Sequence, residues 1–248
     1  MMKLLTDIGN SQIKIAQNDN QKLLKIKSFS IEDIEKFRKY ITKTYAKKGC
    51  ELFYSSVLGD KFNRKFKKIL KGIFISETQF KSTKSLMTVK NCYNQPGKLG
   101  SDRWAQIVAA HKIFKKNTMI VSCGSAISID YVTATGIHKG GLILSGAERY
   151  NNCFLDIHNL KNIKLSNNPN NSNILQSNTL KQITTGYKVM ISSSIGAIYS
   201  SLCQKGKSKP NLLITGSYSQ NISRDLKIKC LVEPYFVLKS LALIQGKI

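Results

Sequence analysis

The chain lacks the patterns that identify membrane-spanning and secreted proteins. No window approaches the roughly 20 consecutive apolar residues that a membrane-spanning helix needs. The N-terminus shows no secretory signal, because MMKLL meets Asp7 after only a few apolar residues and no small-residue cleavage site follows. We therefore expect a soluble protein of the cytoplasm.

The chain also lacks the cysteine spacings of metal-binding and disulfide-rich proteins. None of its six cysteines forms a CxxC pair, and its three histidines show no close spacing with them. These spacings argue against a zinc site and against a disulfide framework. Dispersed thiols suit the reducing cytoplasm, where a cysteine behaves as a small apolar residue.

Acidic residues are few: 14 stand against 39 basic ones, and the formal net charge is +25. One interpretation is a nucleic-acid or anionic-membrane partner, since clustered Lys and Arg neutralise phosphates and release counterions. We favour the other, a solvated surface that reflects biased residue usage, because lysines are spread from Lys3 to Lys247. In the densest cluster, residues 61–72, the apolar residues have helical spacing. The bases there are expected on the exposed face of an amphipathic helix.

The 248 residues, 42% of them hydrophobic, can form one large domain or two of modest size. In the first half we expect strands at 3–9, 12–17, 22–29, 51–57 and 72–77, and helices at 31–48 with Ser30 as N-cap, 61–72 and 102–116. In the second half we expect strands at 118–124, 125–132, 140–146 and 211–217, and helices at 237–244 and at 179–203, the latter interrupted or bounded near Gly186. The Asn/Ser-rich stretch 165–173 is expected to be an exposed loop.

One strand-turn-strand unit occurs twice. Asp7-Ile8-Gly9-Asn10-Ser11 falls opposite Ser122-Cys123-Gly124-Ser125-Ala126, with an offset of 115 residues (122 minus 7). Each copy is preceded and followed by an apolar strand. Two copies imply a duplicated α/β architecture, with domains at residues 1–115 and 116–248.

A glycine turn of this kind can hold phosphate, because small residues let backbone N–H groups approach an anion. Asp7 cannot bind phosphate directly, unless a divalent cation such as Mg²⁺ or its water shell lies between the two anions. One hairpin from each half, facing across a cleft, would hold a nucleotide's phosphates from both sides. The alternative is a tight hairpin with an Asx turn and no ligand.

The residues Gly100-Ser101-Asp102-Arg103 stand at the start of a predicted helix. Free N–H groups and the positive end of the helix dipole favour anionic ligands there. Asp102 is either the N-cap of this helix or a general base at the mouth of an interdomain cleft, with Arg103 fixing an anionic substrate group beside it. The residues alone leave both roles open.

Four motifs together resemble the type III pantothenate kinases. They are Asp7-Ile8-Gly9-Asn10-Ser11, Tyr93-x-x-Pro96-x-x-Leu99-Gly100-Ser101-Asp102-Arg103, Gly124-Ser125-Ala126-x-Ser128-x-Asp130 and Gly140-Gly141-x-Ile143-x-x-Gly146. They follow in that family's order and spacing over nearly the whole chain. The resemblance implies an α/β fold of two duplicated ribonuclease H-like (actin-like ATPase) domains with a nucleotide cleft between them. It also implies ATP-dependent phosphorylation of pantothenate, the first committed step of coenzyme A synthesis, by a homodimer that uses Mg²⁺ and a monovalent cation, K⁺ or NH₄⁺.

The resemblance also implies a role for each motif residue. The ATP-binding residues would be Asp7, Ile8, Gly9, Asn10, Ser11, Gln12, Ile13, Lys14 and Ser125, with Asp7 near Mg²⁺ through water. The pantothenate pocket would be lined by Tyr93, Gly100, Ser101, Asp102, Arg103 and Thr179, the last reaching the substrate across the dimer. Asp102 would withdraw the proton from the substrate's primary hydroxyl. The family's acid for the monovalent cation is replaced by Ser122, so we expect weak or absent stimulation by K⁺.

Two other functions stay open. One is a non-catalytic relative of the same fold that acts as a regulatory or nucleic-acid-binding protein, which the positive charge and the loss at Ser122 make conceivable. The other is a kinase for a different small molecule, because the two hairpins specify phosphate and not the acceptor. Tyr93 and the Gly100–Arg103 segment argue against a kinase for a different small molecule.

Overall fold

The structure is a computed structural model, and it describes residues 2–46, 48–154, 157, 160, 165, 173–205 and 208–247. The chain forms two compact units. The first comprises Met1–Phe114, Thr135–His138 and Tyr235–Ile248, and the second comprises Lys115–Ala134 and Lys139–Pro234. The chain therefore returns to the first unit twice. Among the residues described, no helix combines the length and the apolar composition that a membrane span requires.

The first unit is built on a five-stranded sheet in the order β3-β2-β1-β4-β5. Its strands are β1 (Met2–Ile8), β2 (Gln12–Asp19), β3 (Lys22–Ser30), β4 (Cys50–Ser56) and β5 (Ser76–Phe80). The first three form an antiparallel meander, β4 runs parallel to β1, and β5 runs parallel to β4. The strands predicted at 3–9, 12–17, 22–29 and 51–57 are confirmed. The strand predicted at 72–77 begins only at Ser76, because the chain turns at Gly72, whose φ is +79°.

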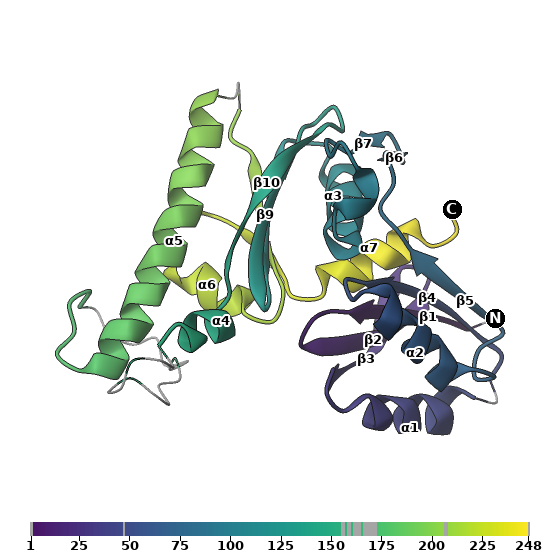
Figure 1. Ribbon diagram of the computed structural model, residues 1–248. Helices are drawn as coiled ribbons and strands as arrows, with labels where there is room; N and C mark the ends of the chain where they lie inside the picture. Colours follow the sequence, from purple (N-terminus) through teal and green to yellow (C-terminus); the bar gives the residue numbers. More distant parts are fainter. Residues whose placement is uncertain are drawn as a thin grey trace. The chain divides into compact units, whose positions relative to one another are not determined.

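Helices cover both faces of this sheet (Figure 1). On one face, α1 (Ile34–Tyr45) and α2 (Asp60–Leu70) share an apolar core with β1, β2 and β4. Phe66 of α2 is wholly buried there, with its ring centroid 5.9 Å from that of Phe37 and 5.5 Å from that of Tyr54. On the other face, α3 (Ser101–Phe114) and α7 (Phe236–Ile244) pack against each other and against β4. Along the chain between β5 and α3, the structure has the short strands β6 (Ser85–Leu86) and β7 (Val89–Lys90) and the 3₁₀ turn η1 (Pro96–Lys98).

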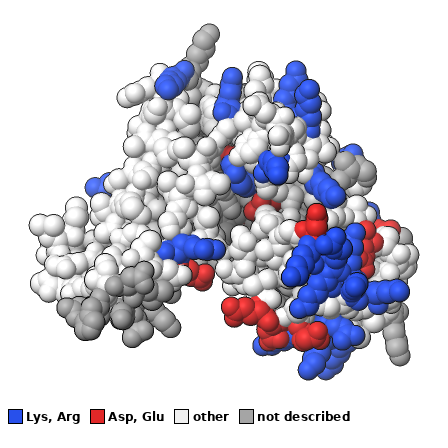
Figure 2. Space-filling view, viewed as in Figure 1, with Lys and Arg blue, Asp and Glu red and all other residues white. Residues whose placement is uncertain are grey.

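The basic cluster lies on the exposed face of α2, as predicted. Figure 2 shows Lys and Arg side chains gathered over α2 and α1. The exposed bases of α2 are Lys61, Arg64, Lys65, Lys67 and Lys68.

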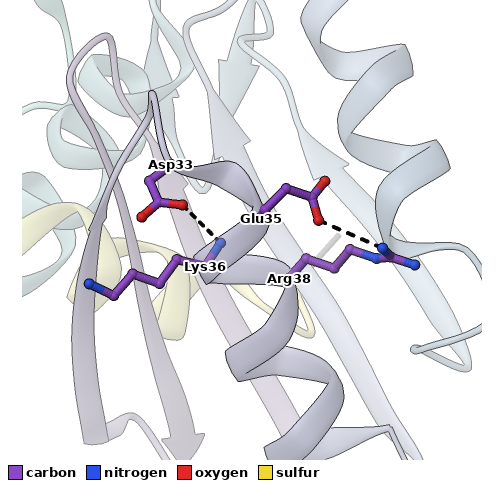
Figure 3. Close-up of polar contacts among 4 residues, drawn as sticks. All are labelled: Asp33, Glu35, Lys36 and Arg38. Carbon is purple, nitrogen blue, oxygen red and sulfur yellow. Dashed lines mark hydrogen bonds and ion pairs between the residues drawn. The ribbon is translucent and has the colours of Figure 1, made fainter.

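The start of α1 differs from the prediction. Ser30 is the last residue of β3 and pairs with Gln12, so its backbone is not available to begin a helix. Asp33 is the N-cap instead. Its carboxylate accepts a hydrogen bond from the backbone N–H of Lys36 at 3.1 Å (Figure 3). Glu35 and Arg38 form an exposed ion pair along the next turn, with 3.7 Å between nitrogen and oxygen.

The second unit is built on a five-stranded sheet in the order β10-β9-β8-β11-β12. Its strands are β8 (Thr118–Cys123), β9 (Ala126–Val132), β10 (His138–Ser145), β11 (Asn211–Thr215) and β12 (Leu231–Glu233). The first residue of β10, His138, belongs to the first unit. Its helices are α4 (Ala147–Asn152), α5 (Thr179–Lys205) and α6 (Ser219–Asp225). The helices α5 and α6 share an apolar core with β8, β9 and β11.

The two sheets repeat one topology, which confirms the predicted duplicated α/β architecture. In each, an antiparallel hairpin contributes the central strand, which pairs on its other side with a parallel strand. The alternation of buried residues agrees as well. Leu4 and Ile8 of β1 face α1 and α2, and their counterparts at an offset of 115, Met119 and Cys123, face α5 and α6.

Two predictions in the second half concern α5 and the stretch that precedes it. The interruption expected near Gly186 is wrong, because α5 continues through it. Buried Tyr187 and Ile191 anchor this part of the helix in the core, and tertiary packing outweighs the roughly 1 kcal/mol by which glycine weakens a helix. The loop predicted at 165–173 lies outside the described residues, apart from its two ends.

Helix α7 belongs to the first unit although it follows the second unit in the chain. Its residues Phe236, Leu238 and Leu241 are buried. The predicted division into residues 1–115 and 116–248 assigned this helix to the C-terminal domain. That division stays a prediction, since a packing unit and a duplicated stretch of sequence need not have the same ends.

Candidate active site

The first hairpin, which we define as β1 and β2 with the turn at residues 9–11, places Asp7 near the end of β1. The Gly9 N–H donates to the Gln12 carbonyl at 2.9 Å and closes the turn. Asp7 is half-buried and lies directly opposite Lys14 in the antiparallel register. Residues paired in this way project to the same face of the sheet, so the carboxylate and the ammonium group lie on one side.

The start of α3 brings a second carboxylate toward Asp7. Ser55 is the neighbour of Asp7 on β4, and its hydroxyl oxygen lies 2.9 Å from that of Ser101. The Ser101 hydroxyl also donates to the Ser56 carbonyl at 3.1 Å. These buried hydrogen bonds hold the N-terminus of α3 on the sheet beside Asp7, and Asp102 is the next residue.

Asp102 lies within the first turn of α3 and is not its N-cap. The Trp104 N–H donates to the Gly100 carbonyl at 2.9 Å, and this first bond of the helix makes Gly100 the cap residue. A methyl group added at Gly100 would stand only 2.6 Å from the Asp102 Oδ1. The carboxylate is therefore turned back over the helix start. The role of Asp102 as a general base stays a prediction.

The two carboxylates influence each other electrostatically. Burial raises the pKa of Asp7 to about 7, the negative charge of Asp102 adds to this rise, and the positive charge of Lys14 opposes it. A site that disfavours a bare carboxylate charge gains from a bound cation, because the cation restores the balance of charge. The arrangement is thus suited to a divalent ion beside Asp7.

The predicted substrate residues Tyr93 and Arg103 are in contact. Arg103 is buried, and its Nη1 donates to the Tyr93 hydroxyl at 3.3 Å. The Tyr93 N–H donates to the Asn91 Oδ1 at 3.0 Å, and the Tyr93 ring stacks on the ring of His138. Sequence reasoning missed His138 because it lies 45 residues after Tyr93 (138 minus 93). The one sequence feature that could have indicated His138 is its position two residues before the Gly140-Gly141 motif.

The second hairpin, defined as β8 and β9 with the turn at residues 124–125, lacks the charges of the first. Ser122 takes the position of Asp7 and lies opposite Ser128, which takes the position of Lys14. Both members of the charge pair are therefore absent. A serine pair offers neutral hydroxyl groups to a ligand and no carboxylate to a cation.

The second hairpin is also one residue shorter than the first. The first closes on the pair Ile8 and Ile13, and the second on Cys123 and Ile127. The offset of 115 between the copies therefore holds up to Gly124 and becomes 114 after the turn (127 minus 13). The predicted matches of Asn10 with Ser125 and of Ser11 with Ala126 are shifted by this deletion.

The turn of the second hairpin packs against Gly146, the N-cap residue of α4. A methyl group at Gly146 would lie 2.4 Å from the carbonyl oxygen of Gly124 and 2.5 Å from that of Ser125. Such distances are far below van der Waals contact, so only glycine fits. The close approach fixes the position of Ser125, the predicted ATP contact in this unit.

The structure groups the predicted residues by unit. The first unit contains Asp7, Ile8, Gly9, Asn10, Ser11, Gln12, Ile13, Lys14, Tyr93, Gly100, Ser101, Asp102 and Arg103. The second contains Ser122, Ser125 and Thr179. Thr179 is exposed at the first position of α5, where the Asn178 Oδ1 accepts a hydrogen bond from the Lys181 N–H at 3.2 Å.

Comparison with known proteins decides the family. A sequence profile of the type III pantothenate kinases matches residues 3–201. The chain belongs to the type III pantothenate kinase family. A type III pantothenate kinase from Nitrosococcus oceani is 27% identical over 249 residues, which cover 97% of this chain and 92% of the relative. One from Hahella chejuensis is 33% identical over 102 residues, and that match spans 40% of this chain and only 42% of the relative.

The fold agrees with the family. A crystal structure from Campylobacter jejuni, described as a Baf family transcriptional activator, superposes with a TM-score of 0.61 and 22% identity, over 97% of this chain and 96% of that one. At this identity the likeness shows the fold alone. The predicted α/β fold with two ribonuclease H-like units is confirmed, as is the family that the four motifs resembled.

Proposed function

We propose that this type III pantothenate kinase transfers the γ-phosphoryl group of ATP to the primary hydroxyl of pantothenate. The product would be 4'-phosphopantothenate, and the reaction the first step of coenzyme A synthesis. One observation carries the proposal: the hydrogen bonds of Ser101 to β4 hold α3 so that Asp102 lies near Asp7. The proposal assigns to these neighbouring carboxylates the roles of proton acceptor, for Asp102, and of cation ligand, for Asp7.

In the proposed reaction, the hydroxyl oxygen of pantothenate forms a bond to the γ-phosphorus. The bond from that phosphorus to the β–γ bridging oxygen breaks, and ADP leaves. The proton of the hydroxyl passes to the Asp102 carboxylate. Phosphoryl transfer depends mainly on positioning and charge stabilisation, so a base with good geometry is sufficient.

The other side chains bind and orient the two substrates. Arg103, with its fixed set of N–H donors, suits the carboxylate of pantothenate, and Tyr93 lies against it. Residues Asp7 through Lys14 and Ser125 would hold the phosphates of ATP through backbone N–H groups and hydroxyls. We include Thr179 as a pantothenate contact supplied across a homodimer.

The residues of the first hairpin fit Mg²⁺. This ion prefers one or two carboxylates together with waters and substrate phosphates, and half-buried Asp7 offers one carboxylate whose charge is disfavoured when no cation is bound. Bound there, Mg²⁺ would neutralise negative charge on the phosphates of ATP. Asp7 would hold the ion through its water shell.

Turnover by the purified protein with ATP, Mg²⁺ and pantothenate, followed as ADP release, tests the proposal. General-base catalysis contributes about 10²–10⁴-fold, so we expect Asp102→Asn to lose activity by that factor. Asp60→Asn is the matched control, because Asp60 is also an acid in the first turn of a helix but lies in α2. Wild-type turnover no faster than that of Asp102→Asn would refute the proposal.

The exposed bases of α2 favour one competing function, nucleic-acid binding (Figure 2). Salt-sensitive binding of DNA without turnover of pantothenate would support it over the kinase. Turnover of another small alcohol in preference to pantothenate would instead identify a kinase of different acceptor specificity.

A further inference from the structure

A small cluster of side chains in the first unit stands behind the proposed pantothenate pocket. The rings of Tyr93 and His138 stack with 6.2 Å between centroids and 17° between planes. His138 is completely buried, whereas Tyr93 is half-buried. The His138 Nδ1 lies 3.5 Å from the Cys92 Sγ. The Tyr93 hydroxyl accepts a hydrogen bond from Arg103.

The backbone around His138 is held in place. The Lys90 N–H donates to the Gly136 carbonyl at 2.8 Å, and Lys90 also forms a parallel bridge with Ile137. Gly136 has a φ of +78°, and a methyl group there would stand 2.7 Å from the Thr88 carbonyl oxygen. The segment 135–138 is therefore fixed against β7, and His138 has little freedom to move.

These contacts run from a rigid support, His138, through Tyr93 to Arg103. A half-buried tyrosine can change rotamer about its Cα–Cβ bond unless a neighbouring group blocks the swing of its ring. His138 places an offset, nearly parallel ring against that of Tyr93 and blocks this swing on one side. Rotation about the Cα–Cβ bond sets the position of the Tyr93 hydroxyl, and the hydroxyl is an acceptor for the Arg103 guanidinium. Precise placement of such a guanidinium matters, because its donors match a carboxylate in one geometry.

We propose that His138 is a positioning residue for the acceptor pocket: it fixes the ring of Tyr93 and, through the Tyr93 hydroxyl, the guanidinium of Arg103. The inference rests on the proposed function, since it concerns the binding of pantothenate. It assigns no chemical step to His138. The stacked ring is what matters, and another planar ring of similar size would supply most of the effect.

A matched pair of substitutions tests this role. Both His138→Leu and His138→Phe are apolar, and both remove the contact with Cys92 equally, but only Phe keeps a ring. Aromatic pairs of this kind correspond to an affinity change of about three- to tenfold. We therefore expect the Leu variant to have a KM for pantothenate about three- to tenfold above that of the Phe variant. The KM for ATP should agree between the two within about twofold, since only the acceptor pocket is altered.

Thermal unfolding of both variants supplies the control. Equal KM values for pantothenate in the Leu and Phe variants would overturn the inference, as would a parallel rise in the KM for ATP. A Leu variant that fails to fold, or unfolds far below the Phe variant, would show that His138 serves folding and would overturn it too. Wild-type protein is assayed first, and absence of its turnover refutes the proposed function. Wild-type turnover together with equal KM values for pantothenate in the Leu and Phe variants refutes only the role of His138.

Discussion

Replacing Gly146 by alanine should disturb the second hairpin through steric overlap alone. Gly146 has a φ of −78° and a ψ of 168°, which alanine adopts without strain. The new methyl group would nevertheless lie 2.4 Å from the Gly124 carbonyl oxygen, whereas real contacts of this kind essentially never fall below 3.0 Å. Either the turn at residues 124–125 or the start of α4 must therefore move by at least 0.6 Å, the difference between these distances.

The expected effects follow from that displacement. Overpacking of a tight site costs about 1–3 kcal/mol. For a chain of this size, 1 kcal/mol lowers Tm by roughly 2–4 °C, so we expect a fall of about 2–12 °C. A misplacement of 1 Å can cost about 10²-fold in activity, and a shift of the turn that carries Ser125 should lower kcat/KM for ATP about tenfold.

Gly59 provides the matched control. It is the N-cap of α2, its φ of −67° and ψ of 172° are close to those of Gly146, and a methyl group there would meet nothing within 4 Å. Both substitutions carry the same modest cost of alanine at an N-cap. Differential scanning fluorimetry and a coupled assay of ADP release would compare the two variants. Equal Tm and equal kcat/KM for ATP in Gly146→Ala and Gly59→Ala would refute the reasoning.

Two further predictions concern charge. Because the folded pKa of Asp7 is raised from 3.8 to about 7, the stability that its protonated form provides is present below pH 4 and is lost as the pH rises through 7. In the absence of Mg²⁺ and ATP, the Tm of Asp7→Asn minus that of the wild type should grow between pH 4.5 and 7.5, and a constant difference would contradict this. Because Ser122 faces Ser128 and the family's acid is missing, K⁺ should stimulate turnover weakly or not at all, with Na⁺ at equal ionic strength as the control. A strong, saturable K⁺ requirement would overturn that expectation, and Ser122→Asp should create a K⁺ response.

The fold was predictable where a local pattern determines the element. The hairpins follow from alternating apolar residues on either side of a glycine turn, and α3 from its helical run. The short elements β6, β7, η1, α4, α6 and β12 were missed, because two to seven residues carry too little periodicity. The cap of α1 was misplaced because Ser30 and Asp33 are both good N-caps, and only the pairing of Ser30 in β3 excludes it.

The site was predictable as a set of residues but not as an arrangement. The motifs indicated Asp7, Asp102 and Arg103, yet the contact that brings the first two together runs through Ser55 and Ser101, which are 46 residues apart. No local pattern marks such a contact. The same holds for His138, whose partner Tyr93 lies on another segment. The length difference between the hairpins also required the strand register, because the sequence motifs align equally well without a gap.

The placement of α7 has a consequence for the order of events during synthesis. Phe236, at the start of α7, follows Phe114, at the end of α3, by 122 residues (236 minus 114). At about 5–20 residues per second, a ribosome needs roughly 6–24 s to add them. Throughout that interval the apolar surface that α7 covers on α3 and the first sheet has no cover from this helix. The nascent first unit thus exposes apolar surface until long after its own strands are made, because α7 is synthesised only after the last residue of the second unit, Pro234.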